Sequence, residues 1–309
     1  MLTITLLGCG GTMPLPGRAL SSCAVTMAGR TVLFDCGEGT QTACRAQHVS
    51  LYKIDHICLT HFHGDHIFGL PGLLQSMGNA GRKKPVTVYG PKGLDELMRH
   101  FLAMCPGLPF GVKLCELHPG PGGGPMLLPG MDGLRLTAFE AEHRVPCIGY
   151  QLQLPRAGRF DPAAAETLGV PRPLWKKLQQ GEPVALPDGS AVVPEQVLGP
   201  ARKGLSVVFC TDSRPCAALQ KAAQNVDLLI CDATYGDDRQ WDKAVEFGHS
   251  TFRESAGLAA FADVKRLWLT HYSAAIEDPA EYLPIAHEIF PAAEAGFDGK
   301  RLELKFEER

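Results

Sequence analysis

The sequence lacks any apolar run that could span a bilayer, and it lacks the paired cysteines of common zinc and redox motifs. A membrane-spanning helix needs about 20 consecutive apolar residues, and no segment reaches that length. The eleven cysteines form no C-x-x-C pair, and most of them lie within apolar, strand-like runs. Cysteines in such positions behave as reduced core residues. These absences predict a cytoplasmic protein that has no membrane partner.

The sequence also lacks a strong excess of either charge. The formal net charge is -3 and the pI is about 6.4. This balance excludes a globally basic surface, so an anionic partner would have to be met by a local patch. The first residues lack a basic n-region, and their apolar run is too short for a signal peptide. We therefore expect the chain to begin with a strand.

Short β-rich runs alternate with helical patterns along the 309 residues, which is typical of an α/β protein. Strands are predicted over residues 3–7, 24–27, 31–35, 54–60, 86–89, 134–141, 148–154, 205–211, 227–231, 264–270 and 302–306, and helices over residues 40–48, 67–78, 93–104, 215–224, 251–262 and 279–290. The segments IDHICLTHF (54–62) and VKRLWLTHY (264–272) echo each other. Two similar halves that face each other within one catalytic domain, residues 1–309, would explain this echo.

Two segments interrupt the alternation. Residues 106–130 are rich in glycine and proline, including GPGGGP at 120–125, and are predicted to form a loop between strands. Residues 152–204 contain eight prolines and show little pattern apart from a short helix near residues 174–179. A connection of this length is usually a lid, a binding arm or a disordered segment. With seven basic residues against five acidic ones, it is also the locally basic part of the chain.

The stretch THFHGDH (60–66) gathers potential metal ligands at the end of a predicted strand. Strand-to-helix corners carry the sites of α/β proteins, and the His-x-His-x-Asp-His spacing suits metal coordination. Three further predicted strands each end in one isolated potential ligand. The seven candidates are His61, His63, Asp65, His66, His143, Asp212 and His271.

Seven ligands exceed the four that one tetrahedral zinc ion takes, so the sequence predicts two metal ions. A carboxylate has two oxygens and can bridge two ions, whereas an imidazole offers one lone pair. Asp212 is therefore the natural bridging ligand. Two ions about 3.5 to 4 Å apart lower the pKa of water towards about 7 and neutralise a phosphoryl or carbonyl oxygen. This chemistry predicts a hydrolase.

The motif at 60–66, with His143, Asp212 and His271 in this order, resembles the metallo-β-lactamase superfamily. Within it, the chain is most similar to the ribonuclease Z family, which cuts the 3' trailer from precursor tRNA. The similarity covers nearly the whole chain and is carried by DCGEGTQ (35–41), HGDHIFGLPGLL (63–74), YGPKGL (89–94), CTDSRP (210–215) and GHST (248–251). The first motif alone would also fit lactamases, glyoxalases and diiron proteins. The GHST element and the inserted arm are more specific.

The resemblance implies a four-layer αβ/βα sandwich with an inserted, protruding arm at 152–204, and it implies two zinc ions. The ligands implied for one ion are His61, His63 and His143, those for the other are Asp65, His66 and His271, and Asp212 would bridge them. Asp65 would also accept a proton from the attacking water, and His249 would protonate the departing ribose 3'-oxygen, which suits an imidazole. The products would be a tRNA 3'-hydroxyl and a 5'-phosphorylated trailer.

The chain departs from the family pattern beside the catalytic histidine and after the last ligand. Where the family has His-Glu-Ala-Thr, whose glutamate orients that histidine, this chain has CDAT at 231–234, with a carboxylate one methylene shorter. Asp232 either reaches His249 or is only a polar residue at a strand end. The usual Arg-Tyr after His271 is replaced by Ala275-Ile276, which affects the expected recognition of the tRNA end. A capping box, Thr251-x-x-Glu254, would fix the helix start next to His249.

In the ribonuclease Z family the arm clamps the tRNA elbow. In a homodimer, it often presents this substrate to the site of the partner subunit. The resemblance therefore implies precursor tRNA and a second copy of the chain as partners, and a lid over a small-substrate pocket is the alternative. Shape recognition of folded RNA relies largely on phosphate contacts. The candidate contacts are Arg172, Lys176, Lys177, Arg202 and Lys203. Arg172 and Pro173 stand where the family has Gly-Pro. Arg202 and Lys203 lie in the basic loop whose family pattern is Pro-x-Lys-x-Gly.

Two rival functions stay open from the sequence. A hydrolase of the same fold could act on small phosphodiesters, thioesters or lactams, and it would not need the arm to bind tRNA. A non-catalytic RNA-binding protein or a diiron redox protein is the second rival. The complete set of seven ligands together with His249 favours an enzyme.

Overall fold

The computed structural model describes residues 1–120, 126–131 and 133–307. Contacts divide them into a larger unit, Met1–Gln153 with Ser206–Glu307, and a smaller unit, Leu154–Leu205. Residues 121–125 of the GPGGGP run lie outside the described residues. Within the described part of the chain, no helix has the length and apolar character required to cross a membrane.

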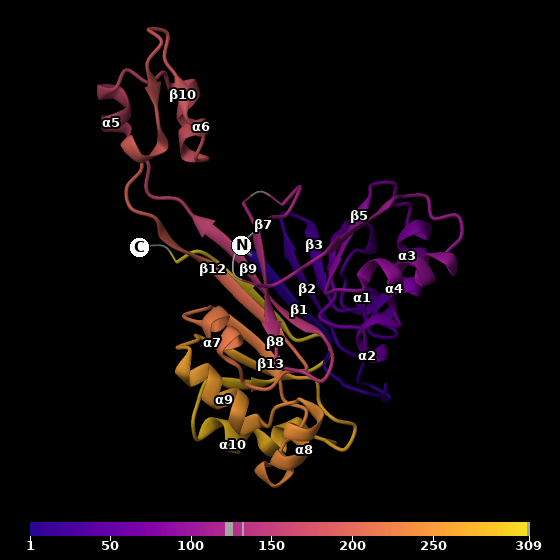
Figure 1. Ribbon diagram of the computed structural model, residues 1–309. Coiled ribbons are helices and arrows are strands. Elements are labelled where there is room, and N and C mark those ends of the chain that lie inside the picture. Colours follow the sequence, from indigo (N-terminus) through magenta and orange to yellow (C-terminus); the bar gives the residue numbers. More distant parts are fainter. Residues whose placement is uncertain (121–125, 132, 308–309) are drawn as a thin grey trace. The chain divides into compact units, whose positions relative to one another are not determined.

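The larger unit contains two seven-stranded sheets (Figure 1). In spatial order, the first sheet consists of β16 (Arg301–Leu304), β1 (Leu2–Gly8), β2 (Ser22–Met27), β3 (Arg30–Phe34), β4 (Ile54–Cys58), β5 (Val86–Gly90) and β6 (Val112–Glu116). The strands from β16 to β3 pair antiparallel, and those from β3 to β6 pair parallel. The parallel part places the end of β4 at an edge where a binding site can form.

The second sheet repeats this mixed plan. In spatial order, it consists of β15 (Ala293–Ala295), β14 (Leu267–Thr270), β13 (Leu228–Asp232), β12 (Arg202–Cys210), β9 (Cys147–Arg156), β8 (Arg135–Ala141) and β7 (Met126–Leu127). The strands from β15 to β12 pair parallel, whereas β7, β8 and β9 form an antiparallel series. The echo between residues 54–62 and 264–272 corresponds to β4 and β14, one parallel strand in each sheet.

Helices cover the outer faces of the two sheets (Figure 1). Aromatic side chains join their inner faces. The ring of Phe34 in β3 lies 5.3 Å from that of Phe209 in β12 and 5.6 Å from that of Tyr150 in β9. The helices of the larger unit are α1 (Thr40–Ala46), α2 (Gly64–Ile67), α3 (Leu70–Asn79), α4 (Leu94–Ala103), α7 (Ala217–Ala223), α8 (Trp241–Phe247), α9 (Phe252–Phe261) and α10 (Leu283–His287), with 3-10 turns η1 (Leu51–Lys53), η4 (Asp238–Gln240) and η5 (Pro279–Tyr282). The predicted four-layer sandwich is confirmed.

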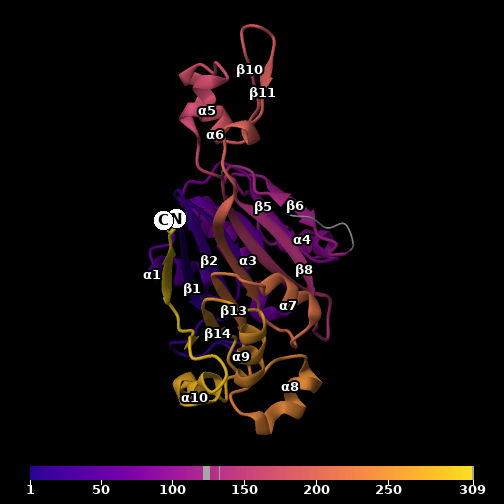
Figure 2. The same ribbon diagram turned by 90° about the vertical axis from the view of Figure 1, so that its left-hand side faces the viewer.

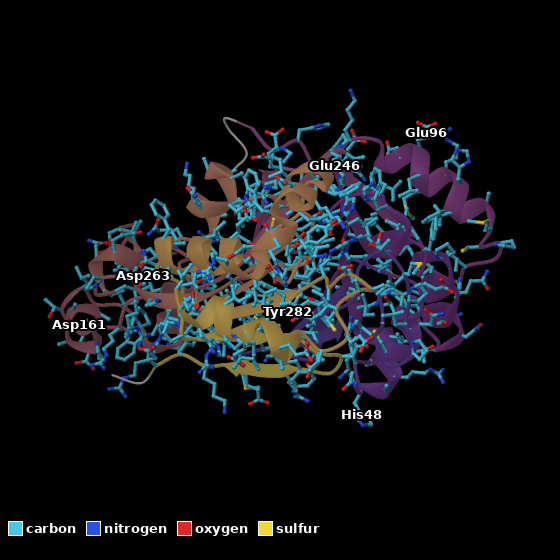
Figure 3. The ribbon with its side chains drawn as sticks, turned by 90° about the horizontal axis from the view of Figure 1, so that it is seen from below. His48, Glu96, Asp161, Glu246, Asp263 and Tyr282 are labelled. Carbon is cyan, nitrogen blue, oxygen red and sulfur yellow. The ribbon has the colours of Figure 1, made fainter. Side chains whose placement is uncertain are left out.

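The smaller unit consists of short helices and a hairpin (Figure 2) and has a hydrophobic core of its own. Its elements are α5 (Pro162–Thr167), η2 (Arg172–Leu174), α6 (Trp175–Gln179), η3 (Pro194–Gln196) and the hairpin β10 (Val184–Ala185) with β11 (Ala191–Val192). Asp161, labelled in Figure 3, caps α5 by accepting hydrogen bonds from the backbone N–H groups of Ala163 and Ala164. Leu178 and Ala165 are fully buried in this core. The insert is thus a folded unit with its own packing.

Several local predictions are wrong. The prediction of a loop over residues 106–130 misses β6 and β7, and the prediction of little regular structure over residues 152–204 misses α5 and the β10–β11 hairpin. Each missed strand is short or lies at a sheet edge, where pairing with a neighbouring strand decides its conformation. Helix α8 and strand β15 were also not predicted. In these segments, prolines and glycines indicate the boundaries of short helices and strands rather than an absence of regular structure.

Candidate metal centre

The ends of four strands bring the predicted ligands to one place. Beyond β4, the buried residues Leu59 and Thr60 lead into His61, and His63 directly precedes α2, which carries Asp65 and His66. The other ligands follow β8, β12 and β14. They are His143, Asp212 and His271.

The backbone takes a left-handed conformation at two of these ligands. The φ angles are +52° at Asp212 and +63° at His271. This region is unfavourable for residues other than glycine and is typical of functional sites. Gly11 lies so close that a Cβ atom there would be 2.5 Å from Cε1 of His271. The loop at Gly11 therefore requires glycine to leave room for this imidazole.

The ligand atoms form two groups. In the first, Nδ1 of His63 lies 2.9 Å from Nε2 of His61 and 3.4 Å from Nε2 of His143. In the second, Nε2 of His271 lies 3.1 Å from Nε2 of His66 and 3.3 Å from Oδ2 of Asp65. The first group together with Asp212, and the second group by itself, have the nitrogen and oxygen donors that a metal ion takes.

Asp212 lies between the two groups and turns one oxygen towards each. Its Oδ1 is 3.0 Å from Nε2 of His66 and 3.1 Å from Nε2 of His271. Its Oδ2 is 3.7 Å from Nε2 of His61 and 3.9 Å from Nε2 of His143. Oδ1 is buried and accepts no hydrogen bond of regular geometry. A buried carboxylate oxygen without such a bond fits a metal ligand, so the residues present suit a bridged pair of ions.

The charges of the site also fit cations. Burial lowers the pKa of His61, His63 and His143, which keeps these imidazoles neutral, as ligands must be. Burial opposes charge at His66 as well, but the carboxylates of Asp212 and Asp35 hold its pKa well above the ordinary value. A bound metal ion would supply the positive charge that these carboxylates favour.

Hydrogen bonds orient the ligating imidazoles. Nδ1 of His66 lies 2.7 Å from Oδ2 of Asp35, and Oδ1 of Asp35 accepts a hydrogen bond of 2.8 Å from the Thr60 backbone. Nδ1 of His271 lies 3.0 Å from Oγ1 of Thr234, and Nδ1 of His143 lies 2.9 Å from the carbonyl oxygen of Gly248. Such contacts leave Nε2 free to bind metal.

Asp35 and Thr234 have no metal role in the sequence prediction, although both lie inside quoted motifs, DCGEGTQ and CDAT. Asp35 follows β3 just as the ligands follow their strands. That position is the signal that could have identified it.

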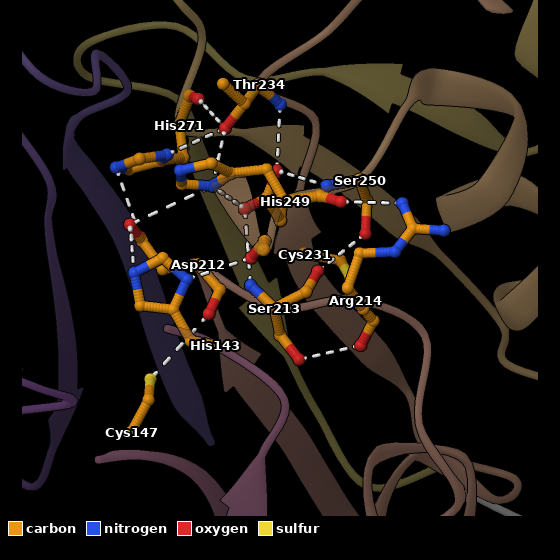
Figure 4. Close-up of polar contacts among 12 residues, drawn as sticks. His143, Cys147, Asp212, Ser213, Arg214, Cys231, Thr234, His249, Ser250 and His271 are labelled. Atoms are coloured by element: carbon orange, nitrogen blue, oxygen red, sulfur yellow. Dashed lines mark hydrogen bonds and ion pairs between the residues drawn. The ribbon is translucent and has the colours of Figure 1, made fainter. Parts of the chain in front are cut away.

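His249 lies beside the ligand candidates His143, Asp212 and His271 (Figure 4). Its Nδ1 is 2.8 Å from Oδ2 of Asp232, and its ring stacks 5.4 Å from that of His271. The shorter carboxylate of this chain therefore reaches the histidine. Burial would lower the pKa of His249, but the charge and hydrogen bond of Asp232 raise it to about 9. A raised pKa favours the protonated imidazole, which is the form that a proton donor requires.

The loop that carries His249 is fixed by a mostly buried ion pair and a helix cap. Nη1 of Arg214 donates a hydrogen bond of 2.7 Å to the carbonyl oxygen of His249, and both terminal nitrogens bind the carboxylate of Glu254. Glu254 also accepts a hydrogen bond of 3.0 Å from the backbone N–H of Thr251, whose Oγ1 accepts from the backbone of Glu254. The predicted capping box is confirmed.

The basic candidates for substrate contact lie in the smaller unit. Lys176 and Lys177 are exposed on α6. The guanidinium of Arg172 lies over the ring of Trp175 and 3.4 Å from the carboxylate of Glu166. Two more candidates lie at the start of β12. They are Arg202, whose Nε donates to the carbonyl of Ala157, and Lys203, which is exposed.

Comparisons with known proteins identify the family of the chain. A family model described as the metallo-beta-lactamase superfamily matches residues 20–128. Ribonuclease Z of Lachnospira eligens is 45% identical over 100% of this chain and 99% of its own, and that of Lachnoclostridium phytofermentans is 45% identical over 99% of each. Among solved structures, the short form of human tRNase Z is 26% identical, with a TM-score of 0.69 over 98% of this chain and 100% of its own.

Proposed function

The chain belongs to the ribonuclease Z family of metal-dependent endoribonucleases, and we propose that it removes the 3' trailer of precursor tRNA by hydrolysis of one phosphodiester bond. The products are a tRNA 3'-hydroxyl and a 5'-phosphorylated trailer. The observation that carries the proposal is the position of Asp212. This residue turns one oxygen to each of two ligand groups and lies next to His249, whose pKa is raised. This arrangement provides cation sites and a proton donor for one phosphodiester.

The proposed cofactors are two Zn²⁺ ions per chain. One ion would be held by His61, His63 and His143, the other by Asp65, His66 and His271, and Asp212 would bridge them. Bound zinc would lower the pKa of water and neutralise charge on the phosphoryl oxygens. The mixture of imidazoles and carboxylates is a ligand set that zinc accepts.

The chain's own residues handle the protons. Asp65 is proposed to accept the proton of the attacking water, and its carboxylate is held by a hydrogen bond of 2.6 Å from the backbone N–H of Thr12. Although burial opposes ionisation, contacts with His271 and His66 keep the pKa of Asp65 below its ordinary value. On the leaving side, His249 is proposed to protonate the ribose 3'-oxygen, and Asp232 keeps that imidazole charged and oriented.

The smaller unit is proposed to bind the tRNA elbow. Its exposed basic side chains suit contacts with phosphates, which position an RNA without reading its bases. The proposed contacts are Arg172, Lys176, Lys177, Arg202 and Lys203. The proposal includes a homodimer, in which the arm of one protomer serves the site of its partner. A cytoplasmic location is also proposed, because all eleven cysteines are free of disulfide bonds and all but Cys115 and Cys216 are buried.

The proposal is tested with a precursor tRNA that carries a 3' trailer. Zinc-loaded protein should make a single cut near the discriminator base, and mapping the ends should find a 3'-hydroxyl on the tRNA. His249→Ala should lose about 10²- to 10⁴-fold in kcat, the usual contribution of a general acid. Failure of the wild-type protein to cut, with two metals bound per chain, would overturn the tRNA assignment and favour a small-molecule hydrolase.

A further inference from the structure

Arg144 follows the metal-ligand candidate His143 and stacks on the helix that leads to His249. Its guanidinium carbon lies 4.9 Å from the ring centroid of Phe247, the last residue of α8. The next residue, Gly248, has a φ of +71°, and a Cβ atom there would be 3.2 Å from the backbone nitrogen of Arg144. The guanidinium is therefore anchored where the His143 loop and the His249 loop pack against each other.

The charge of Arg144 is not neutralised by contact. The residue is exposed, and among the described residues no carboxylate lies within ion-pair distance of its guanidinium. Arg214, two residues after Asp212, is the contrast, because Glu254 holds its guanidinium. Arg214 is thus used inside the fold, whereas Arg144 presents a charge to solvent.

The charge of Arg144 also reaches the site. Tyr235, whose ring centroid lies 6.3 Å from that of His249, responds to this charge. At Tyr235, burial raises the pKa, Asp232 and Glu246 add to that increase, and Arg144 opposes it. Glu246, labelled in Figure 3, is thus the nearby carboxylate that opposes Arg144 without pairing with it.

We propose that Arg144 binds a phosphate of the RNA backbone next to the scissile bond, with Phe247 aligning the guanidinium by stacking. A guanidinium binds phosphate with two parallel hydrogen bonds, and an aromatic face keeps it oriented without removing its charge. A nucleic acid offers a phosphate on each side of the bond that is cut. The inference rests on the proposed function and adds a substrate contact in the larger unit, separate from the basic residues of the arm.

The experiment compares two substrates that share the chemistry but differ in flanking phosphates. Precursor tRNA has them, whereas bis(p-nitrophenyl) phosphate has only the phosphate that reacts. Arg144→Ala should raise KM for precursor tRNA about tenfold and reduce the slope of log(kcat/KM) against log salt by about 0.7 to 0.9, as loss of one phosphate contact requires. Its kcat/KM for the small diester should stay within about twofold of wild type.

Matched variants separate charge, stacking and general effects. Arg99→Ala removes an exposed arginine of α4 that has no ion pair among the described residues, and it should change neither substrate. Compared with Arg144→Ala, Arg144→Lys should restore the salt slope but only part of the affinity for precursor tRNA. Phe247→Leu should show the same salt slope and the same partial affinity as Arg144→Lys. Glu246→Gln should lower KM for precursor tRNA. Binding of precursor tRNA in a His249→Ala background gives a readout without turnover, and Arg144→Ala should weaken it about tenfold.

The outcomes distinguish this inference from the proposed function. Wild-type protein that cuts the small diester but not precursor tRNA would overturn the proposed function, and with it the inference. Wild-type protein that cuts precursor tRNA while Arg144→Ala keeps the wild-type KM and salt slope would overturn the inference alone. An equal loss on both substrates with reduced metal content would also overturn it, because Arg144 would then support the His143 loop rather than bind RNA.

Discussion

At the scale of single residues, the contact between Asp232 and His249 gives a pH prediction. A general acid must be protonated, so kcat should stay level through neutral pH and fall as pH rises through about 9, the pKa of His249. Asp232→Asn removes the charge that raises this pKa, so the fall should begin at lower pH, and kcat at neutral pH should drop about 10- to 100-fold. The pH profile of kcat for precursor tRNA measures both effects.

A conservative variant is the control for this contact. Asp232→Glu keeps the charge and restores the carboxylate length of the family pattern, so its alkaline limb should stay near that of the wild type. If Asp232→Asn and the wild type lose activity at the same pH, Asp232 does not set the charge of His249. Its carboxylate would then serve the backbone N–H groups of Ser213, Thr234 and Ser250, from which it also accepts hydrogen bonds.

The two ligand groups predict a metal stoichiometry. His61→Ala removes a nitrogen from the first group and His271→Ala removes one from the second, so each variant should lose about one equivalent of zinc per chain. The exposed His118, outside both groups, is the matched control, and His118→Ala should keep two equivalents. Plasma mass spectrometry on dialysed protein measures the content. A full complement of zinc in both site variants would contradict the assignment.

The site shows which residues a sequence can reveal and which it cannot. His61, His63, Asp65 and His66 lie in one short motif, so their spacing alone indicates coordination. Arg214 also lies in a quoted motif, but its role depends on a hydrogen bond to the carbonyl oxygen of His249, 35 positions away. Contacts of this kind arise from loops that meet only in the fold, and spacing carries no signal for them.

At the scale of elements, the start of α9 predicts a coupling between stability and activity. Glu254→Gln leaves the guanidinium of Arg214 without its carboxylate and weakens the capping box at Thr251. Both side chains of the ion pair are mostly buried, so unfolding free energy should fall by about 1 to 3 kcal/mol. Because Arg214 also holds the His249 carbonyl, kcat should fall while KM for precursor tRNA changes little.

Urea denaturation and steady-state kinetics test this coupling. Glu281→Gln, an exposed glutamate of η5 with no ion pair among the described residues, should leave both quantities unchanged. A Glu254→Gln protein that is destabilised but keeps the wild-type kcat would show that the ion pair supports α9 without positioning His249.

The same scale explains the errors in predicting the fold. Strand β14, with the sequence LWLT, carries a continuous apolar run. Strand β4, with the sequence IDHIC, is buried throughout and leads into the apolar residue Leu59, and both strands are recognised from sequence. Strand β6 has the short sequence VKLCE, largely half-buried, and its pairing with β5 at the sheet edge decides its conformation. Helix α8 has one fully buried residue, Ala244, so its pattern is not amphipathic enough to be recognised.

At the scale of the whole molecule, the two units predict a separation of binding from chemistry. The metal-ligand candidates lie in the larger unit, and the adjacent lysines Lys176 and Lys177 lie exposed in the smaller one. Replacing both lysines by glutamine should raise KM for precursor tRNA and reduce the salt slope of kcat/KM by up to about 1.5, since two phosphate contacts are lost. The kcat for precursor tRNA and the hydrolysis of bis(p-nitrophenyl) phosphate should stay unchanged.

The chain provides a matched control for this variant in a second exposed lysine pair. Lys83 and Lys84 lie in the larger unit between α3 and β5, so their replacement removes the same charge without touching the arm. If both double variants lower the salt slope equally, net charge rather than the arm attracts the RNA. If only the Lys176 and Lys177 variant does so, the smaller unit contributes phosphate contacts of its own, and a lid over a small-substrate pocket is excluded as its sole role.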